Sequence, residues 1–251
     1  MDKKGLYFKG EIKFCVSGDK YNLRHTSPLY LNVIKKEQIE AFPTDQSGGI
    51  RSGDFHNYSL FLDSNANVVW YSPASTLCYP SMYSLDDCCS LNFNINLANS
   101  KLIFINKPLI PCKDSNIKQK IEIKVDSSSS LIYWDAINSG RIAHNEQWEF
   151  LRFGNKLELH CDNTLAYKEN WTLTKNMIPT NLSGFGENNL YATGIFYGSI
   201  ALEKLETLKQ ICNEHNIIYS VGEIDEKTFI IKLIDKTGIG LNSITTNIIL
   251  D

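Results

Sequence analysis

The residues best suited to chemistry lie close together in the segment YWDAINSGRIAHNEQW (133–148). Asp135 interrupts an apolar, strand-like run, and Arg141 and Glu146 follow within the next eleven residues. Two carboxylates can act as general acid and general base in a hydrolase. The same three side chains can instead satisfy one another in a turn, because a guanidinium group binds a carboxylate through two parallel hydrogen bonds. The segment by itself leaves both interpretations open.

Two further acids stand out because of their surroundings. Asp54 ends the glycine-rich segment SGGIRSGD (47–54), which lacks the Lys-Ser/Thr pair of a phosphate-binding loop and precedes a strand-like run. We interpret this segment as a sharp turn closed by an acidic side chain. Glu169, like Asp135, interrupts an apolar strand. Both are either outward-facing polar residues or part of a hydrated polar path, because buried carboxylates must be paired or solvated.

Histidines and cysteines give no sign of a tightly bound metal. No histidines have the HxH, HxxxH or HExxH spacing of zinc sites, and none of the seven cysteines have CxxC spacing. We expect the cysteines to be reduced and buried as small apolar side chains.

Composition excludes several classes of partner. The chain has 251 residues, a net charge of −3 and a pI of about 6.0, so no basic surface indicates nucleic acid. No apolar run approaches the roughly 20 residues of a membrane helix. The first residues, MDKKGLYFKGEIKF, contain no signal-peptide hydrophobic region. A cytoplasmic protein is expected.

The elements that must position these residues repeat along the chain. Four segments share a small polar turn followed by an apolar run, and the first apolar residues after the turns are 34, 29 and 34 positions apart. They are Val68, Leu102, Leu131 and Leu165. A strand-like run also precedes each turn, so each unit is predicted to be a β-hairpin. Hairpins bury their apolar faces by stacking. The prediction is a mainly β fold, an elongated stack of β-hairpins or layered sheets over residues 1–175.

The pattern changes near residue 176. A polar connector and a strand precede residues 200–216, whose apolar residues recur at helical spacing. Residues 217–234 are predicted to form a hairpin, and residues 238–251 permit a short second helix. We expect residues 176–251 to form a strand–helix–hairpin segment, with one or two C-terminal helices, packed on the β core as a single domain.

Taken in order, four motifs resemble the urease accessory protein UreD family, called UreH in some organisms. They are SGGIRSGD (47–54), SPAST (72–76), YWDAINSGRIAHNEQW (133–148) and DNTLAYKE (162–169). The family carries a Gly-Gly-x-x-x-Gly-Asp turn and a Gly-Arg-x-x-x-x-Glu motif. The combination is more specific than either motif alone.

The resemblance implies a β-rich, non-enzymatic chaperone of nickel insertion. Such a protein binds UreF and, through it, the GTPase UreG, docks with them on apo-urease, and passes nickel through an internal, water-filled tunnel. No cofactor is tightly bound, and nickel is only in transit. The implied polar lining consists of Asp54, Ser75, Asp135, Glu146 and Glu169. The implied structural motif consists of Gly48, Gly49, Gly53, Gly140 and Arg141.

A conduit for divalent ions would need scattered acids and no cluster of histidines or cysteines, as this chain has. Divalent ions pass weakly coordinating carboxylates and hydroxyls, whereas thiolate or imidazole clusters trap them. Arg141 is a poor nickel ligand, and we expect it to pair with Glu146 or Asp135 and hold the turn. Two alternatives stay open: an all-β protein-binding scaffold without a metal role, with its acids at the surface, and a carboxylate-dependent hydrolase, with two acids converging in an open cleft.

Overall fold

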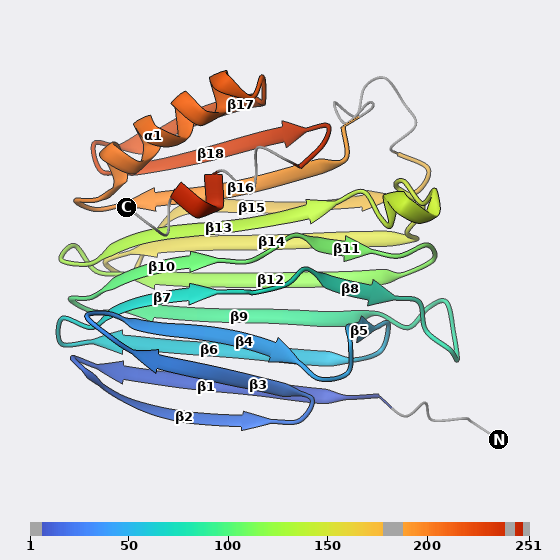
Figure 1. The fold of residues 1–251 in the computed structure, drawn as a ribbon, viewed down its shortest axis with the longest axis horizontal. Coiled ribbons are helices and arrows are strands. Elements are labelled where there is room, and N and C mark those ends of the chain that lie inside the picture. Colours follow the sequence, from blue (N-terminus) through green and yellow to red (C-terminus); the bar gives the residue numbers. More distant parts are fainter. Residues whose placement is uncertain (1–6, 178–187, 239–243, 248–251) are drawn as a thin grey trace.

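The protein consists of two large β-sheets that face each other, with one helix against the second sheet (Figure 1). The computed structural model describes residues 7–177, 188–238 and 244–247. The first sheet contains, in spatial order, β15 (Thr164–Thr174), β14 (Arg152–Cys161), β12 (Asn116–Val125), β9 (Cys89–Leu97), β6 (Phe55–Asp63), β1 (Lys9–Ser17) and β2 (Lys20–Thr26).

The second sheet has eleven strands. Its main path is β17 (Ile218–Asp225), β18 (Thr228–Asp235), β16 (Leu190–Tyr197), β13 (Ser130–Asn138), β10 (Lys101–Ile105), β7 (Asn67–Tyr71), β4 (Ile39–Asp45) and β3 (Leu29–Lys35). Three short strands lie off this path: β11 (Leu109–Pro111), β8 (Thr76–Tyr79) and β5 (Ile50–Arg51). The mainly β, layered prediction is confirmed.

Three of the four predicted hairpins are instead crossings between the two sheets. The outgoing strand β6 pairs in parallel with β1 and β9, whereas its return strand β7 pairs in parallel with β10 and β4. The turns after β9 and β12 connect the sheets in the same way. A strand with alternating residues has one apolar face whether the next strand of the chain pairs with it in a hairpin or lies opposite it in another sheet. Alternation therefore could not distinguish a hairpin from a crossing between sheets. Only β14 and β15 form the predicted hairpin, with antiparallel pairing.

Successive crossings place equivalent residues beside one another. Trp70, Phe104 and Tyr133 occupy matching positions on β7, β10 and β13, and their rings stack with centroid separations of 5.6 and 5.4 Å. Stacked aromatic rings of this kind stabilise a core beyond the area they bury. We call the direction across the strands, along which these rings stack, the stacking axis.

The C-terminal elements extend and cover the second sheet. The helix predicted over 200–216 is confirmed as α1 (Ala201–Glu214), and its apolar face packs on the outer side of β13 and β16. As a result β13 is buried on both faces. The predicted hairpin is confirmed as β17 and β18. Residues 244–247 form a helical turn, and the rest of the predicted second helix lies outside the described residues. Among the described residues, α1 and the short helical segments are too short or too polar to cross a bilayer.

Candidate functional site

Polar residues line up along the stacking axis on the inner face of the second sheet. Asp135 of β13 is in register with Thr193 of β16, which is in register with Lys232 of β18. Their side chains face the first sheet, because Tyr133 and Ile230, two positions away on the same strands, belong to the core between the sheets. The Lys232 ammonium donates a hydrogen bond of 2.8 Å to the Thr193 hydroxyl.

The first sheet presents a matching pair of polar residues. Gln119 of β12 is in register with Asn155 of β14, and both are buried on the inner face. The Gln119 amide donates to a carboxylate oxygen of Asp135 and so bridges the two sheets. The two registers therefore bring Asp135, Thr193, Lys232, Gln119 and Asn155 together in one polar set, which we call the interior row.

Glu169 of β15 lies next to the interior row and is only 8% exposed. Its carboxylate accepts hydrogen bonds from the Asn155 amide at 3.2 Å and from the Tyr167 hydroxyl at 2.9 Å. It also accepts from the Trp171 indole and forms an ion pair with Lys232 of the second sheet. Four donors therefore surround the Glu169 carboxylate and hold it in place.

Burial shifts the pKa values of the two ionisable members of the interior row. It raises the pKa of the Asp135 carboxyl to about 6, although hydrogen bonds from Gln119 and Asn106 oppose the shift. It lowers the pKa of the Lys232 ammonium to about 7, although the Asp135 carboxylate opposes that shift. Both groups can therefore change charge near neutral pH.

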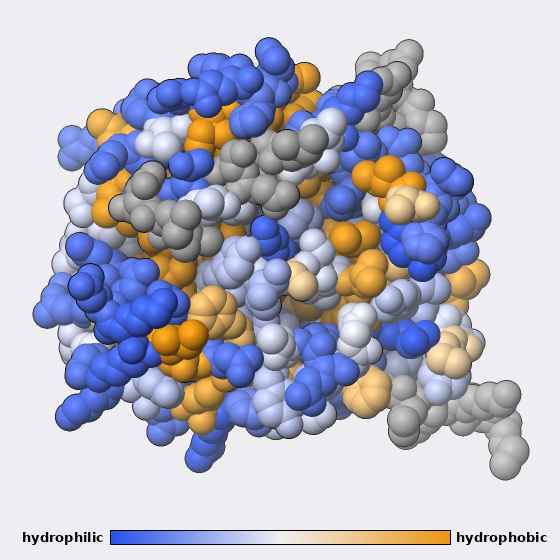
Figure 2. All heavy atoms as spheres, viewed as in Figure 1, coloured by the Kyte–Doolittle hydropathy of each residue, from blue (hydrophilic) through white to orange (hydrophobic). Residues whose placement is uncertain are grey.

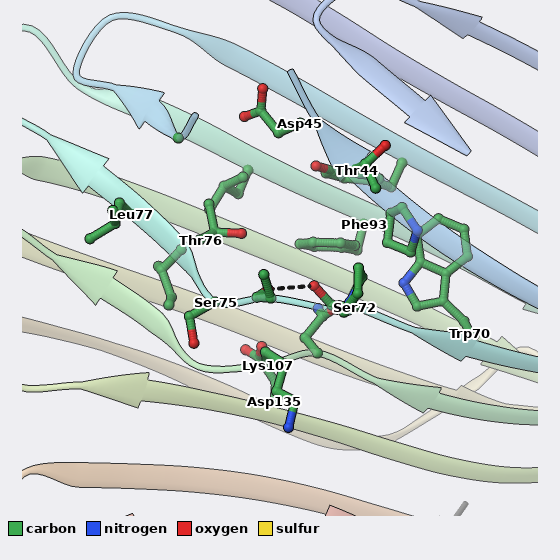
Figure 3. A pocket seen from close by; sticks show the side chains of 18 of the residues that line it. Thr44, Asp45, Trp70, Ser72, Ser75, Thr76, Leu77, Phe93, Lys107 and Asp135 are labelled. Atoms are coloured by element: carbon green, nitrogen blue, oxygen red, sulfur yellow. Dashed lines mark hydrogen bonds between the residues drawn. The ribbon is translucent and has the colours of Figure 1, made fainter. Parts of the chain in front are cut away.

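A cavity of about 290 Å³ lies between the sheets at one end of the interior row, and Asp135 and Gln119 line it (Figure 3). Its floor carries the rings of Tyr58, Trp70 and Phe93. Hydroxyl groups, a second acid and a lysine are also among the lining residues: Thr44, Asp45, Ser72, Ser75, Thr76 and Lys107. The face of the molecule drawn in Figure 1 and Figure 2 carries residues of intermediate hydropathy at its middle, over the segment that joins β7 to β8.

A second, much smaller cavity of about 10 Å³ lies on the other side of Asp135. Asn155, Thr193 and Trp171 also line it. A volume of that size is close to the minimum for one water molecule. Asp135 therefore stands between a wide compartment and a narrow one, and the Glu169–Lys232 ion pair is joined to the narrow one through hydrogen bonds to Asn155 and Thr193.

The acids of the sequence motifs separate into two groups in the structure. Asp135 and Glu169 lie in the interior, and Ser75 is exposed at the mouth of the large cavity. Asp54 instead closes a turn: its two carboxylate oxygens each accept a backbone hydrogen bond of 2.8 Å, from Phe8 and from Arg51. It does not line either cavity.

Glu146 also serves a turn. Of the two expected partners of Arg141, Glu146 and Asp135, the structure shows Glu146. Arg141 Nε donates to Glu146 Oε2 at 2.9 Å, and the guanidinium donates a second hydrogen bond to Oε1. The same carboxylate accepts the backbone N–H of Lys113 at 3.1 Å. The pair therefore ties the 141–146 turn to the segment after β11.

The motif glycines allow close backbone approaches in these turns. Gly49 has φ +136°, and a Cβ there would lie 2.6 Å from the Leu77 carbonyl oxygen. Gly140 has φ +147°, and a Cβ there would lie 2.8 Å from the carbonyl oxygen of Glu146. Only glycine adopts such a conformation without strain. Gly48 and Gly53 also have positive φ.

Several residues of the site were not identified from the sequence. They are Gln119, Asn155, Thr193, Lys232 and Asp45. The available signal was a polar residue at an inward position of an alternating strand, as in the Ile-x-Gln-x-Ile pattern of β12. Within the part of the chain that the structure describes, no three or more His, Cys, Asp or Glu side chains cluster as a metal site would require.

Comparison with known proteins gives one consistent family. The sequence model of the family described as "UreD urease accessory protein" matches residues 19–249. Urease accessory protein UreD of Bacillus cereus is 25% identical over 232 residues, which cover 88% of this chain and 81% of the relative. The UreD protein of Sporosarcina pasteurii is 21% identical over 73% of this chain and 71% of its own length. The Haemophilus influenzae protein is 23% identical over 78% and 76%, respectively.

Proposed function

This chain belongs to the UreD family of urease accessory proteins, which are non-enzymatic, and from that premise we propose that it conducts nickel through its interior to apo-urease. In this proposal it acts in the cytoplasm, in a complex with UreF and UreG that docks on the urease subunits. The observation that carries the proposal is the interior row, a set of polar side chains that runs along the stacking axis inside an otherwise apolar core.

The chemistry of the row suits a divalent ion in transit. The 290 Å³ cavity can hold an ion together with part of its water shell, and hydroxyls and the Asp135 carboxylate are weak ligands for it. Beyond Asp135 the space narrows to about 10 Å³, so onward movement requires the Gln119–Asp135 hydrogen bond to open. Further along, the ion would meet Glu169, after exchange of its Lys232 partner.

The test is replacement of Asp135 by its isosteric amide. We expect Asp135→Asn to assemble normally with UreF, UreG and urease in a pull-down, because the residue lies between the sheets. We expect urease from cells that carry the variant to contain less nickel and to be less active, because the ion loses an anionic partner in its path. Glu122→Gln is the matched control, since Glu122 is on the outer face of the same β12 strand that carries Gln119.

Two outcomes decide between conduit and scaffold. A complex that assembles and activates urease normally with Asp135→Asn would remove the conduit function and leave a docking scaffold. Loss of nickel with the complex intact would support the conduit. The scaffold alternative receives support from one surface feature, the loop of Met82 and Leu85, whose side chains are 73% and 61% exposed.

A further inference from the structure

We propose that Lys232 is a gate: its ammonium group occupies a divalent-cation site beside Glu169 and so closes the far end of the interior row. The inference rests on the proposed function and adds to it a residue that decides when an ion can pass. Lys232 is on the inner face of β18, and Glu169 is on β15 of the facing sheet. An ion that moves from Asp135 to Glu169 must take the place of this ammonium group at the carboxylate.

The groups around the Lys232 ammonium are those that bind a cation. The Glu169 carboxylate forms an ion pair with it, and the Thr193 hydroxyl accepts a hydrogen bond of 2.8 Å from it. The ring centroids of Tyr191 and Tyr167 lie 5.5 and 5.9 Å from Nζ, within the range of cation–π attraction. A carboxylate, a hydroxyl and two aromatic faces together favour a positive charge at this position.

A buried acceptor next to Glu169 has no hydrogen-bond partner among the described residues. Asn155 is 7% exposed, and its amide nitrogen donates to Glu169 at 3.2 Å, which fixes the orientation of the amide. The carbonyl oxygen of the same amide, Oδ1, is unpartnered. Buried polar atoms normally have partners, so this oxygen favours a ligand that brings a positive charge. Asn155 and Thr193 both line the narrow cavity, so a cation there would have the amide oxygen and the hydroxyl as ligands.

The room that an ion needs at this position is the room that the lysine now fills. The narrow cavity alone holds about 10 Å³, close to the minimum for one water molecule. An ion with part of its water shell needs more space, and it also needs the Glu169 oxygen to which the ammonium group is bound. The lysine and the ion therefore exclude each other.

Lys232 has a side open to solvent, into which it can withdraw. Its side chain is 25% exposed, whereas that of Glu169 is 7% exposed. The first sheet ends at β15, but the second sheet continues past β18 to β17 (Figure 1). Ser220 of β17 is in register with Lys232 and is exposed, so no described strand of the first sheet covers the inner face there. A long, flexible side chain can turn towards this opening while the core keeps its packing.

The first experiment measures Ni²⁺ binding to the full-length chain by equilibrium dialysis. Lys232→Met removes the ammonium group and keeps an apolar stem, and Lys232→Ala removes the stem as well. Each variant should bind one equivalent of Ni²⁺ roughly tenfold more tightly than the unmodified chain does, because the ion no longer competes with a positive charge. Adding Glu169→Gln to either variant should abolish the gain. The matched control is Lys168→Met, since Lys168 is next to Glu169 in the chain but pairs with Glu158, at 3.2 Å.

The possible results of this experiment separate clearly. Tighter binding in the Lys232 variants that disappears with Glu169→Gln, and that Lys168→Met does not show, would support the gate. Equal binding by Lys232→Met and the unmodified chain would overturn it. A gain that survives Glu169→Gln would also overturn it, because the ion would then be bound elsewhere.

The protonation of Lys232 gives a second test, in which the variant keeps the positive charge and the ion pair. The titratable groups that face Lys232 are Asp135, Glu169, Tyr167 and Tyr191. Burial raises the pKa of both tyrosine hydroxyls, so these stay neutral. Burial lowers the pKa of the Lys232 ammonium to about 7, although the Asp135 carboxylate opposes the shift. The lysine therefore loses its charge as the pH rises from about 6 to about 8, and its ion pair with Glu169 weakens.

Ni²⁺ binding at pH 6 and at pH 8 should consequently differ more in the unmodified chain than in Lys232→Arg, whose guanidinium stays charged. We expect the gain in affinity to be about threefold to tenfold larger in the unmodified chain, because the fraction of uncharged lysine rises about tenfold. The Asp135 carboxyl also titrates near pH 6, but it does so in both proteins. An equal gain in the two proteins would overturn the gate.

The gate and the conduit fail separately. Tighter Ni²⁺ binding by Lys232→Met, together with normal urease activation by Asp135→Asn, would leave a cation site without an interior conduit. Unchanged Ni²⁺ binding by Lys232→Met, together with lost activation by Asp135→Asn, would leave the conduit without this gate.

Discussion

Replacement of Asp135 by asparagine should stabilise the folded protein at neutral pH, even though it removes a hydrogen-bonded side chain. Burial raises the pKa of the Asp135 carboxyl to about 6 from its ordinary value of 3.8. An acid with a raised pKa binds its proton more tightly in the folded chain than in the unfolded chain. Ionisation at neutral pH therefore opposes folding, and the amide does not ionise.

The size of the effect follows from the difference of about two pKa units, which corresponds to about 3 kcal/mol at full ionisation. Two effects reduce the gain. The new amide must place its N–H groups, and Lys232 loses a favourable neighbouring charge. We expect Asp135→Asn to raise the free energy of unfolding by about 1–3 kcal/mol at pH 8.

The pH dependence gives the sharper test. Because the folded pKa is above the unfolded one, the unmodified protein loses stability from this group as the pH rises from about 4 to about 6. The variant lacks that loss, so the difference between the two proteins should be small near pH 4 and should reach its full size above pH 6.

Urea unfolding followed by tryptophan fluorescence, repeated from pH 4.5 to pH 8, measures this difference. Glu122→Gln is the control of opposite sign, because ion pairing with Lys124 lowers the pKa of Glu122. It should slightly lower stability or leave it unchanged. A variant Asp135→Asn that is less stable than the unmodified protein at pH 8, or a difference that does not depend on pH, would refute the reasoning.

Three further substitutions test the turns, the cavity and the ion pair. Arg141→Ala should lower the free energy of unfolding by about 1–3 kcal/mol, a loss between those typical of exposed and of buried ion pairs, because the bidentate pair with Glu146 is partly exposed. Arg141→Lys should recover part of this loss, and urea unfolding measures both variants. Ser75→Trp should fill the mouth of the large cavity and reduce urease nickel content without lowering the melting temperature of the chain. Glu169→Gln should leave Lys232 without its anion and lower its pKa further below the value of about 7 in the unmodified protein. Unfolding experiments across pH should therefore show a larger rise in stability up to about pH 10 in the variant than in the unmodified protein, because the unfolded lysine retains a proton that the folded one has lost.

The secondary structure was predictable where hydrophobic period alone decides it. The helix α1 followed from apolar residues at helical spacing, and the strands followed from alternation. Strand pairing was not predictable, because β6 and β7 have the same pattern whether they pair with each other or face each other from two sheets. A polar turn with left-handed residues, such as Asn65, serves either connection.

Of the residues of the candidate site, Asp135, Glu169 and Ser75 were expected from the sequence. Asp135 and Glu169 stand out because carboxylates rarely interrupt apolar strands. Gln119 and Asn155 stand out less, because each is a single uncharged residue at an apolar position of an alternating strand. Only the in-register pairing of β12 and β14 shows that the two amides lie beside each other.

The in-register pairing of neighbouring strands explains how a packed core can carry a row of polar side chains along its stacking axis. Equivalent positions of paired strands are neighbours, both in the parallel pair of β12 and β14 and in the antiparallel pairs of β13, β16 and β18, so one polar residue on the inner face of each of these strands is enough to build the row. Each such residue replaces an apolar one and weakens the core, while the stacked rings of Trp70, Phe104 and Tyr133 add stability nearby. Polar groups retained inside at a cost in stability point to a use other than folding. Removing the acid of the row should therefore increase stability and reduce delivery, whereas removing Arg141 from its turn should reduce both together.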